Sequence, residues 1–129
     1  MAGPSLYRLE LDLPGLADLR QKQGHWRTRA REAAKWRALV RLLTGHRRPT
    51  EPLQRARVTI TRCSSVQPDW DNMVAAGKPI VDGLIRSGPN LPRADVLVDD
   101  SPDVIVERSY LWELAPKGKG HTRVVVEEV

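Results

Sequence analysis

The spacing of apolar residues changes along the chain from every second position to every third or fourth, and back again. Near the N-terminus, apolar and charged residues alternate, which predicts a half-buried strand ending at Pro14-Gly15 and carrying Tyr7, Leu9, Leu11 and Leu13. From Trp26 to Leu43 the steps become helical, and the expected buried face consists of Trp26, Ala30, Ala33, Trp36, Val40 and Leu43. A chain with both periods must combine helices with a sheet.

The two periods also organise the rest of the chain. Alternation returns at 56–61, and Asp71 is a suitable N-cap for a helix that begins near Asn72. Gly77 and Pro79 are expected to interrupt this helix, with a second piece running over 79–87. Two further strands are expected at 103–114 and 122–129, the first with one buried parity made of Val104, Val106, Tyr110, Trp112 and Leu114. We therefore expect an α+β fold, a single domain over 1–129, in which a mixed sheet of about four strands packs with two helices.

Charge is segregated along the chain. Between Arg20 and Arg62 there are 13 Lys and Arg against two acidic residues, whereas the remaining positions hold 8 basic against 14 acidic residues. This separation suggests one surface that binds a polyanion and another that carries acid-dependent chemistry. The candidates for nucleic-acid backbone contacts are Arg27, Arg29, Arg31, Lys35, Lys117 and Lys119. The alternative for the helical stretch is a solvated amphipathic surface helix.

Composition excludes several classes of protein. The single cysteine, Cys63, rules out an internal disulfide and a thiolate-rich zinc site, and its flanks predict a half-buried position at the end of a strand. There is no run of apolar residues long enough to span a bilayer and no apolar N-terminal signal segment. We therefore expect a cytoplasmic protein without a membrane partner.

Two acidic segments are the candidate chemical site. Asp69 and Asp71 occupy alternate positions of an expected extended segment, and Asp99-Asp100 follow an apolar run. Magnesium prefers such oxygen ligands and is often held by one or two carboxylates together with substrate phosphate. The alternative is a helix cap at Asp71, a turn aspartate at Asp69 and an exposed turn at 99–102.

A nearby lysine completes the set. Lys78 and Asp82 are four residues apart and share a face if the segment is helical, either as a surface ion pair or with Lys78 placed to stabilise charge on a metal-bound phosphate. A histidine general base has little support, because none of the three histidines lies next to the acidic residues.

The order of these strings resembles a known family. Asp-x-Asp-Asn at 69–72, Lys-x-x-x-Asp-Gly-Leu at 78–84 and apolar-Asp-Asp at 98–100 are similar to the RusA family of Holliday-junction resolvases of bacteria and their phages. The string His-Trp-Arg-x-Arg at 25–29 resembles phage-type members. Two departures stand out: the interval between Asn72 and Lys78 is longer than in that pattern, and Pro68 stands where the pattern has a basic residue.

The resemblance implies a homodimeric, Mg²⁺-dependent endonuclease, with Mn²⁺ as a substitute, that resolves four-way DNA junctions by paired nicks in recombination and repair. Its catalytic residues carry over to Asp69, Asp71, Asp100 and Lys78, its metal ligands to Asp69, Asp71, Asp99 and Asp100, and its supporting residues to Asn72 and Asp82. Such a protein would act in the cytoplasm of a bacterial or phage-infected cell. Three alternatives stay open: a module that binds branched DNA without cutting it, a nuclease of broader flap or fork specificity, and a structural protein whose acids are caps and turns.

Overall fold

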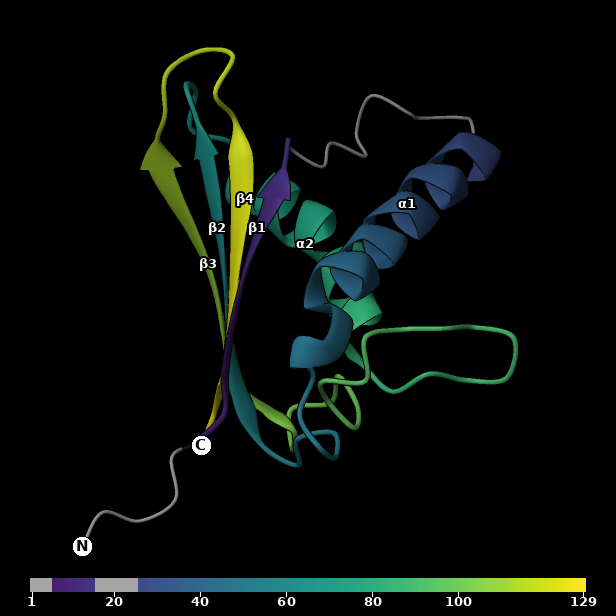
Figure 1. Ribbon diagram of the computed structural model, residues 1–129. Helices are drawn as coiled ribbons and strands as arrows, with labels where there is room; N and C mark the ends of the chain where they lie inside the picture. Colours follow the sequence, from purple (N-terminus) through teal and green to yellow (C-terminus); the bar gives the residue numbers. More distant parts are fainter. Residues whose placement is uncertain (1–5, 16–25) are drawn as a thin grey trace, which may run out of the picture.

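The computed structural model describes residues 6–15 and 26–129, which form one sheet covered by two helices (Figure 1). The elements in chain order are β1 (Arg8–Pro14), α1 (Trp26–Thr44), the short 3-10 helix η2 (Gly45–Arg47), β2 (Ala56–Ser64), α2 (Trp70–Leu84), β3 (Ile105–Leu114) and β4 (His121–Glu128). This arrangement confirms the expected α+β fold with a mixed four-stranded sheet and two helices. His25, part of the string compared with phage resolvases, lies outside the described residues.

The strand order is β1-β4-β2-β3, with β2 and β3 parallel and β4 antiparallel to both of its neighbours. The chain therefore crosses over the sheet twice, through α1 between β1 and β2 and through α2 between β2 and β3. Both helices lie on the same face of the sheet, and the other face is open (Figure 1). Strands β1 and β3 form the two edges.

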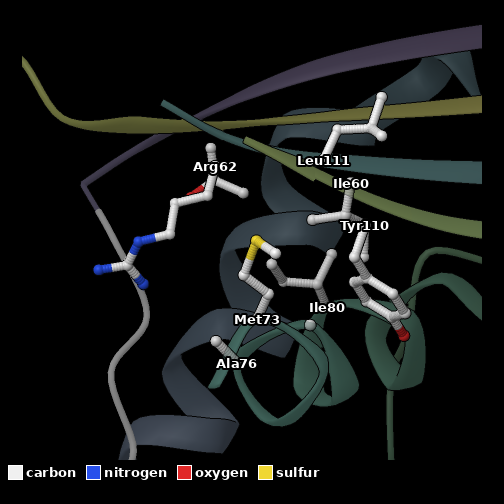
Figure 2. Close-up of a pocket in the computed structure, with 9 residues that line it drawn as sticks. Ile60, Arg62, Met73, Ala76, Ile80, Tyr110 and Leu111 are labelled. Carbon is white, nitrogen blue, oxygen red and sulfur yellow. The ribbon is translucent and has the colours of Figure 1, made fainter. Parts of the chain in front are cut away.

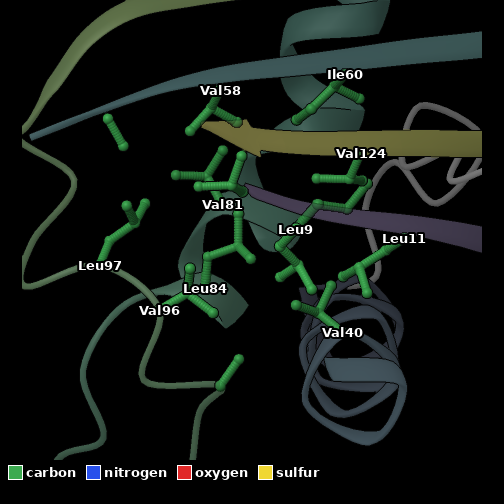
Figure 3. Close-up of a cluster of buried hydrophobic side chains, with 14 of the residues drawn as sticks. Leu9, Leu11, Val40, Val58, Ile60, Val81, Leu84, Val96, Leu97 and Val124 are labelled. Atoms are coloured by element: carbon green, nitrogen blue, oxygen red, sulfur yellow. The ribbon is translucent and has the colours of Figure 1, made fainter. Parts of the chain in front are cut away.

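The core lies between the sheet and the two helices. Alternate residues of β1 and β4 are buried, as the period-two pattern predicts, because only one face of each strand contacts the helices. Figure 3 shows Leu9, Leu11 and Val124 of the sheet facing Val40 of α1, while Val81 and Leu84 of α2 pack beside Val58. Two buried residues of the segment before β3, Val96 and Leu97, complete this cluster.

Helix α1 follows the predicted face from Ala33 onward, and the side chain of Trp26 lies outside the described part of the structure. Trp36 and Val40 are buried and Leu43 is half-buried, but Ala30 is exposed. The helix ends where Gly45 adopts a φ of 52°, a left-handed conformation that suits glycine. Neither helix in the described part of the chain combines the length and apolar character needed to cross a membrane.

Helix α2 differs from the prediction of two pieces, because it is continuous from Trp70 to Leu84 with Pro79 inside it. The carbonyl that Pro79 deprives of a helical hydrogen bond belongs to Ala75, an exposed residue that solvent can reach. Gly77 does not break the helix either; it lies against the sheet, where a Cβ atom would be 2.6 Å from Cε1 of Tyr110. The predicted interruption of the helix at 77–79 is therefore wrong.

The single buried parity predicted for β3 is also wrong. Val106 and Leu114 are exposed, whereas Ile105, on the other parity, is buried. The pairing with β2 shifts register between Ala56 and Arg57, so the side-chain alternation is interrupted near the start of β3. As an edge strand, β3 also extends beyond the cover of the helices, which leaves Leu114 74% exposed.

Candidate functional site

The first acidic segment forms the N-terminus of α2. Asp69 is the N-cap residue, with extended backbone angles, and its carbonyl oxygen accepts hydrogen bonds from the amides of Asn72 and Met73, both at 3.1 Å. Asp71 lies within the first turn and is exposed. The helix therefore begins two residues earlier than predicted, with Asp69 and not Asp71 as its N-cap. The prediction that both carboxylates sit on an extended segment is also wrong, because Asp71 is helical. Negative charge at this end of a helix is favourable, because it interacts with the helix dipole.

The second acidic segment is a bend that leads into β3. The amide of Asp100 donates to Oδ1 of Asp99 at 2.8 Å, and the carbonyl of Asp100 accepts from Nη2 of Arg108 at 2.9 Å. Asp99 is exposed and Asp100 is half-buried. Upstream, the amide of Val98 donates to the carbonyl of Leu53 at 3.1 Å, which fixes the segment beside the start of β2. These contacts give the two aspartates a defined backbone position.

Strand β3 brings the two acidic segments to one side of the sheet. Arg108 holds the bend at Asp100, and Tyr110, two residues further along the strand, contacts Trp70, which lies between Asp69 and Asp71 in sequence. Residues two apart on a strand share a face and are separated by about 7 Å. Both residues pair with helix-facing positions of β2, Val58 and Ile60. One residue of each acidic segment, Trp70 or Asp100, therefore contacts this stretch of the edge strand.

Lys78 lies on the exposed surface of α2. At 3.6 residues per turn, the seven positions between Asp71 and Lys78 amount to about two turns, so the two side chains leave the helix on the same stripe about 10 Å apart. Asp82, four positions further on, shares this stripe and is half-buried. Lys78 therefore lies about two turns along α2 from the acidic N-terminus. Asp82 lies between Lys78 and the C-terminal end of the helix.

Trp70 is a candidate functional residue that the sequence alone did not indicate. Its side chain is 57% exposed although it meets Tyr110 edge-to-face, with ring centroids 5.6 Å apart and an interplanar angle of 88°. An exposed aromatic ring held from behind can stack on an unpaired base, an interaction worth about 1–3 kcal/mol per base. A tryptophan flanked by two aspartates was the available signal.

The space behind this ring pair is too small for a substrate. A cavity of about 20 Å³ lies between α2 and the sheet, lined mainly by apolar side chains that include Ile60, Met73, Ile80 and Tyr110 (Figure 2). Arg62 lies at its margin. A volume of this size holds about one water molecule. Any substrate of the acidic segments must therefore bind on the outer surface.

The predicted nucleic-acid contacts lie at two places. Arg27, Arg29, Arg31 and Lys35 are all exposed in the N-terminal half of α1. Lys117 and Lys119 are exposed on the turn after β3, where the amide of Lys119 donates to the carbonyl of Pro116 at 2.9 Å. Gly118 has a φ of 84° at the third position of this turn, which favours glycine.

Cys63 lies on the opposite, open face of the sheet. It is 2% exposed within β2, deeper than the predicted half-buried position at a strand end. Arg123 Nη2 donates to Glu113 Oε2 at 2.8 Å and contacts the Cys63 sulfur at 3.7 Å. Burial raises the pKa of the Cys63 thiol, and the hydrogen bond from Arg123 lowers the pKa of Glu113. A thiol with a raised pKa is a poor nucleophile, so this cluster is structural.

Within residues 6–15 and 26–129, no three or more His, Cys, Asp or Glu side chains gather in an arrangement that could hold a metal ion. The carboxylates of Asp69, Asp71, Asp99 and Asp100 therefore do not form such a group, although their oxygen chemistry suits Mg²⁺. Comparison with models of known protein families found no match, and neither did comparison with curated protein sequences.

Proposed function

We propose that the protein is a Mg²⁺-dependent endonuclease that cuts branched DNA, with the four-way junction as its substrate. The observation that carries the proposal is that one residue of each acidic segment contacts the same edge strand, Asp100 through Arg108 and Trp70 through Tyr110. The order of the acidic strings and Lys78, which resembles that of the RusA family, supports the choice of reaction. A homodimer follows from the chemistry, because paired nicks across a junction require one site from each of two subunits.

The proposed metal ligands are Asp69, Asp71 and Asp100, with Asp99 adjacent, although these carboxylates do not gather into one metal-holding group in this structure. Mg²⁺ keeps several waters and needs only one or two protein carboxylates when a substrate phosphate is present, so the two aspartates of either acidic segment offer enough carboxylate oxygens, and Mn²⁺ could replace it. When bound, the ion would supply Lewis-acid stabilisation of the phosphate and a more acidic water.

The chain's own residues have distinct tasks in this proposal. Lys78 places a positive charge beside the phosphate, where negative charge develops during cleavage. Asn72 and Asp82 are the supporting residues that the resemblance to the RusA family implies. Trp70 offers its exposed ring to a base at the branch point, where stacking on a neighbouring base is already lost. The basic residues of α1 and of the turn at 116–119 contact phosphates and give affinity that falls with salt.

The test is nicking of a labelled four-way junction, with linear duplex and flap controls, by wild type, Asp71→Asn and Asp103→Asn in Mg²⁺, Mn²⁺ and EDTA. Asp103 is a matched control, because it is an exposed aspartate of the same loop as Asp100 with no proposed role. We expect symmetric metal-dependent nicks, lowered about 100-fold or more by Asp71→Asn, because the metal's stabilisation is worth several kcal/mol and each 1.4 kcal/mol is about tenfold. Asp103→Asn should cut as wild type does.

Two other results would change the assignment. Equal cutting of flaps and junctions would indicate a broader branched-DNA nuclease. Junction binding without cutting in either metal would overturn the enzyme and leave a binding module for branched DNA.

A further inference from the structure

A groove of about 670 Å³ lies between α1 and the loop that follows α2, away from the acidic segments. The α1 wall presents Arg37 and Arg41, one turn apart, with the small residues Ala34 and Ala38 beside them. Small side chains at the floor keep the groove open, while the two guanidinium groups flank it. Its volume falls in the range of ligand clefts, about 300–1,000 Å³.

The opposite wall is a loop fixed by its own hydrogen bonds. Ser87 holds it closed: its amide donates to Asp95 Oδ1 at 2.7 Å, and its Oγ accepts from the amide of Arg93 at 2.8 Å. Gly88 and Leu91 exchange two backbone hydrogen bonds, of 3.0 and 3.1 Å. Figure 1 shows this loop extending from the end of α2 away from the sheet, below α1 in the view. A wall that is already ordered loses little conformational entropy when a ligand binds.

The α1 wall is fixed as well. A Cβ atom on Gly83 would lie 3.0 Å from the Cα of Arg37, so the backbones of α1 and α2 are in close contact at this point. The amide of Ala94, on the loop wall, donates to the carbonyl of the same Gly83 at 2.8 Å. Both walls are therefore tied to one residue of α2, which fixes the width of the groove.

The lining is basic and apolar together. Four arginines, Arg37, Arg41, Arg48 and Arg93, line the groove, and none of the lining residues in the described part of the chain is acidic. Asp95 lies behind Arg48 at 3.6 Å and neutralises part of its charge. The apolar part includes Leu42, which is 75% exposed, and Leu91, which is 38% exposed. A matching ligand must carry several negative charges and also offer apolar or flat surface.

The shape of the basic surface favours an extended ligand. Arg27, Arg31, Ala34, Ala38 and Arg41 follow one another at steps of three or four, so the groove continues into the exposed basic stripe of α1. From Arg31 to Arg41 this stripe extends about 15 Å. A mononucleotide would use only part of it. A double helix, whose major groove alone is about 12 Å wide, would contact the rim without reaching the alanine floor.

We propose that this groove binds a single strand of DNA, with its phosphates on the arginines and its bases on the apolar lining. The choice of polyanion rests on the proposed action on branched DNA. From Asp71 to Gly83, beside the groove, α2 rises about 18 Å, so an unpaired strand leaving the cleavage site could enter the groove after a few nucleotides. Apolar support for bases combined with a basic track is the general pattern of single-strand binding.

The experiment is fluorescence anisotropy of a labelled single-stranded oligonucleotide with the full chain in EDTA, at several salt concentrations. The variants are Arg41→Gln, Arg48→Gln and Leu42→Gln, with Arg8→Gln as the control, because Arg8 is an exposed arginine on β1, outside the groove lining. We expect each arginine variant in the groove to weaken binding several-fold and to reduce the slope of log affinity against log salt by about 0.7. Leu42→Gln should weaken binding with the slope unchanged, and Arg8→Gln should change neither quantity.

Unchanged affinity in both arginine variants would overturn the proposal. So would equal weakening by Arg8→Gln, which would indicate a diffuse charge effect. Binding of an acidic, leucine-containing peptide in place of the oligonucleotide would assign the groove to a protein partner and also overturn it. If the groove variants still nick junctions and their affinity for the single strand is unchanged, the groove proposal is refuted and the nuclease proposal is not. Strand binding lost in the groove variants, with no nicking by wild type, would support the groove and refute the nuclease.

Discussion

Replacement of Gly77 by alanine tests the contact that positions the candidate site. Gly77 lies in the middle of α2, directly over the ring of Tyr110. A Cβ atom there would be 2.6 Å from Cε1 and 3.3 Å from Cδ1 of this ring, and 3.3 Å from Cδ1 of Ile60. Carbon atoms in good contact are about 3.5–4.0 Å apart, so the ring must move by about 1 Å.

Two effects of opposite sign determine the magnitude. Alanine improves on glycine inside a helix by about 1 kcal/mol. Against this, overpacking a core typically costs about 1–3 kcal/mol, and displacement of Tyr110 also disturbs its edge-to-face contact with Trp70, of a type worth about 0.5–1.5 kcal/mol. Tyr110 is 8% exposed and cannot swing freely into solvent. We expect Gly77→Ala to lower the free energy of unfolding by about 1–2 kcal/mol.

The assay is urea unfolding monitored by far-UV circular dichroism. The urea midpoints of the variants are compared where the dependence of the free energy of unfolding on urea is unchanged. Ala75→Gly calibrates the difference in helix preference between alanine and glycine, because Ala75 is exposed on the same helix. This variant should lower the free energy of unfolding by about 1 kcal/mol. In a Tyr110→Leu background the obstacle is gone, and Gly77→Ala should be neutral or stabilising. If Gly77→Ala stabilises the otherwise wild-type chain as much as it does in that background, Tyr110 does not restrict the helix and the reasoning is refuted.

Three further predictions concern Trp70 and the open face of the sheet. Trp70→Ala should weaken four-way junction binding in EDTA by about 5- to 150-fold, the equivalent of about 1–3 kcal/mol for one stacked base, whereas equal affinity would show that the ring contacts no DNA. Cys63 should resist iodoacetamide in the native state and react fully in urea, because it is buried and its pKa is raised; mass spectrometry of timed samples measures this, and rapid native labelling would contradict it. Because the pKa of Glu113 is lowered, its pairing with Arg123 stabilises the fold at pH values above 4.5, the ordinary pKa of this group. This stabilisation is lost as the pH falls through the lowered pKa. Urea midpoints should therefore be lower for Glu113→Gln than for wild type at neutral pH, and the gap should narrow at successive pH values below 4.5, whereas a constant gap would exclude this ion pair as its cause.

The period of the apolar residues predicted the fold because the sheet is covered on one side only. Alternate residues of β1 and β4 contact the helices while their neighbours face the open side, so the period-two signal is undiluted. The same reasoning failed for β3. Its register shift and its position at the edge of the sheet mean that the residues on one parity of the strand are not all buried. Neither property can be derived from the strand's own residues, because both depend on its pairing with β2.

The errors in α2 have a similar origin. Gly77 and Pro79 are helix breakers by local preference, and nothing near them in sequence shows that Gly77 must be small to fit against Tyr110. The groove arginines were equally hidden, because Arg41, Arg48 and Arg93 come from a helix, the segment after it and a distant loop. The acidic strings were visible in the sequence because each is short and contiguous. The predicted metal and nuclease roles of those strings stay predictions.

The topology explains why the two acidic segments contact the same strand but do not form one group. Because β2 and β3 are parallel, the residues after β2 and the residues before β3 start from opposite ends of the strands, and α2 must cross the sheet between them. Asp69 therefore lies at the first end of the crossover and Asp100 beyond its second end. Each segment contacts β3 through one residue: Trp70, next to Asp69, meets the ring of Tyr110, and the carbonyl of Asp100 accepts from Arg108. The geometry of the candidate site is thus controlled by two side chains of the edge strand, which carry no metal-binding chemistry of their own.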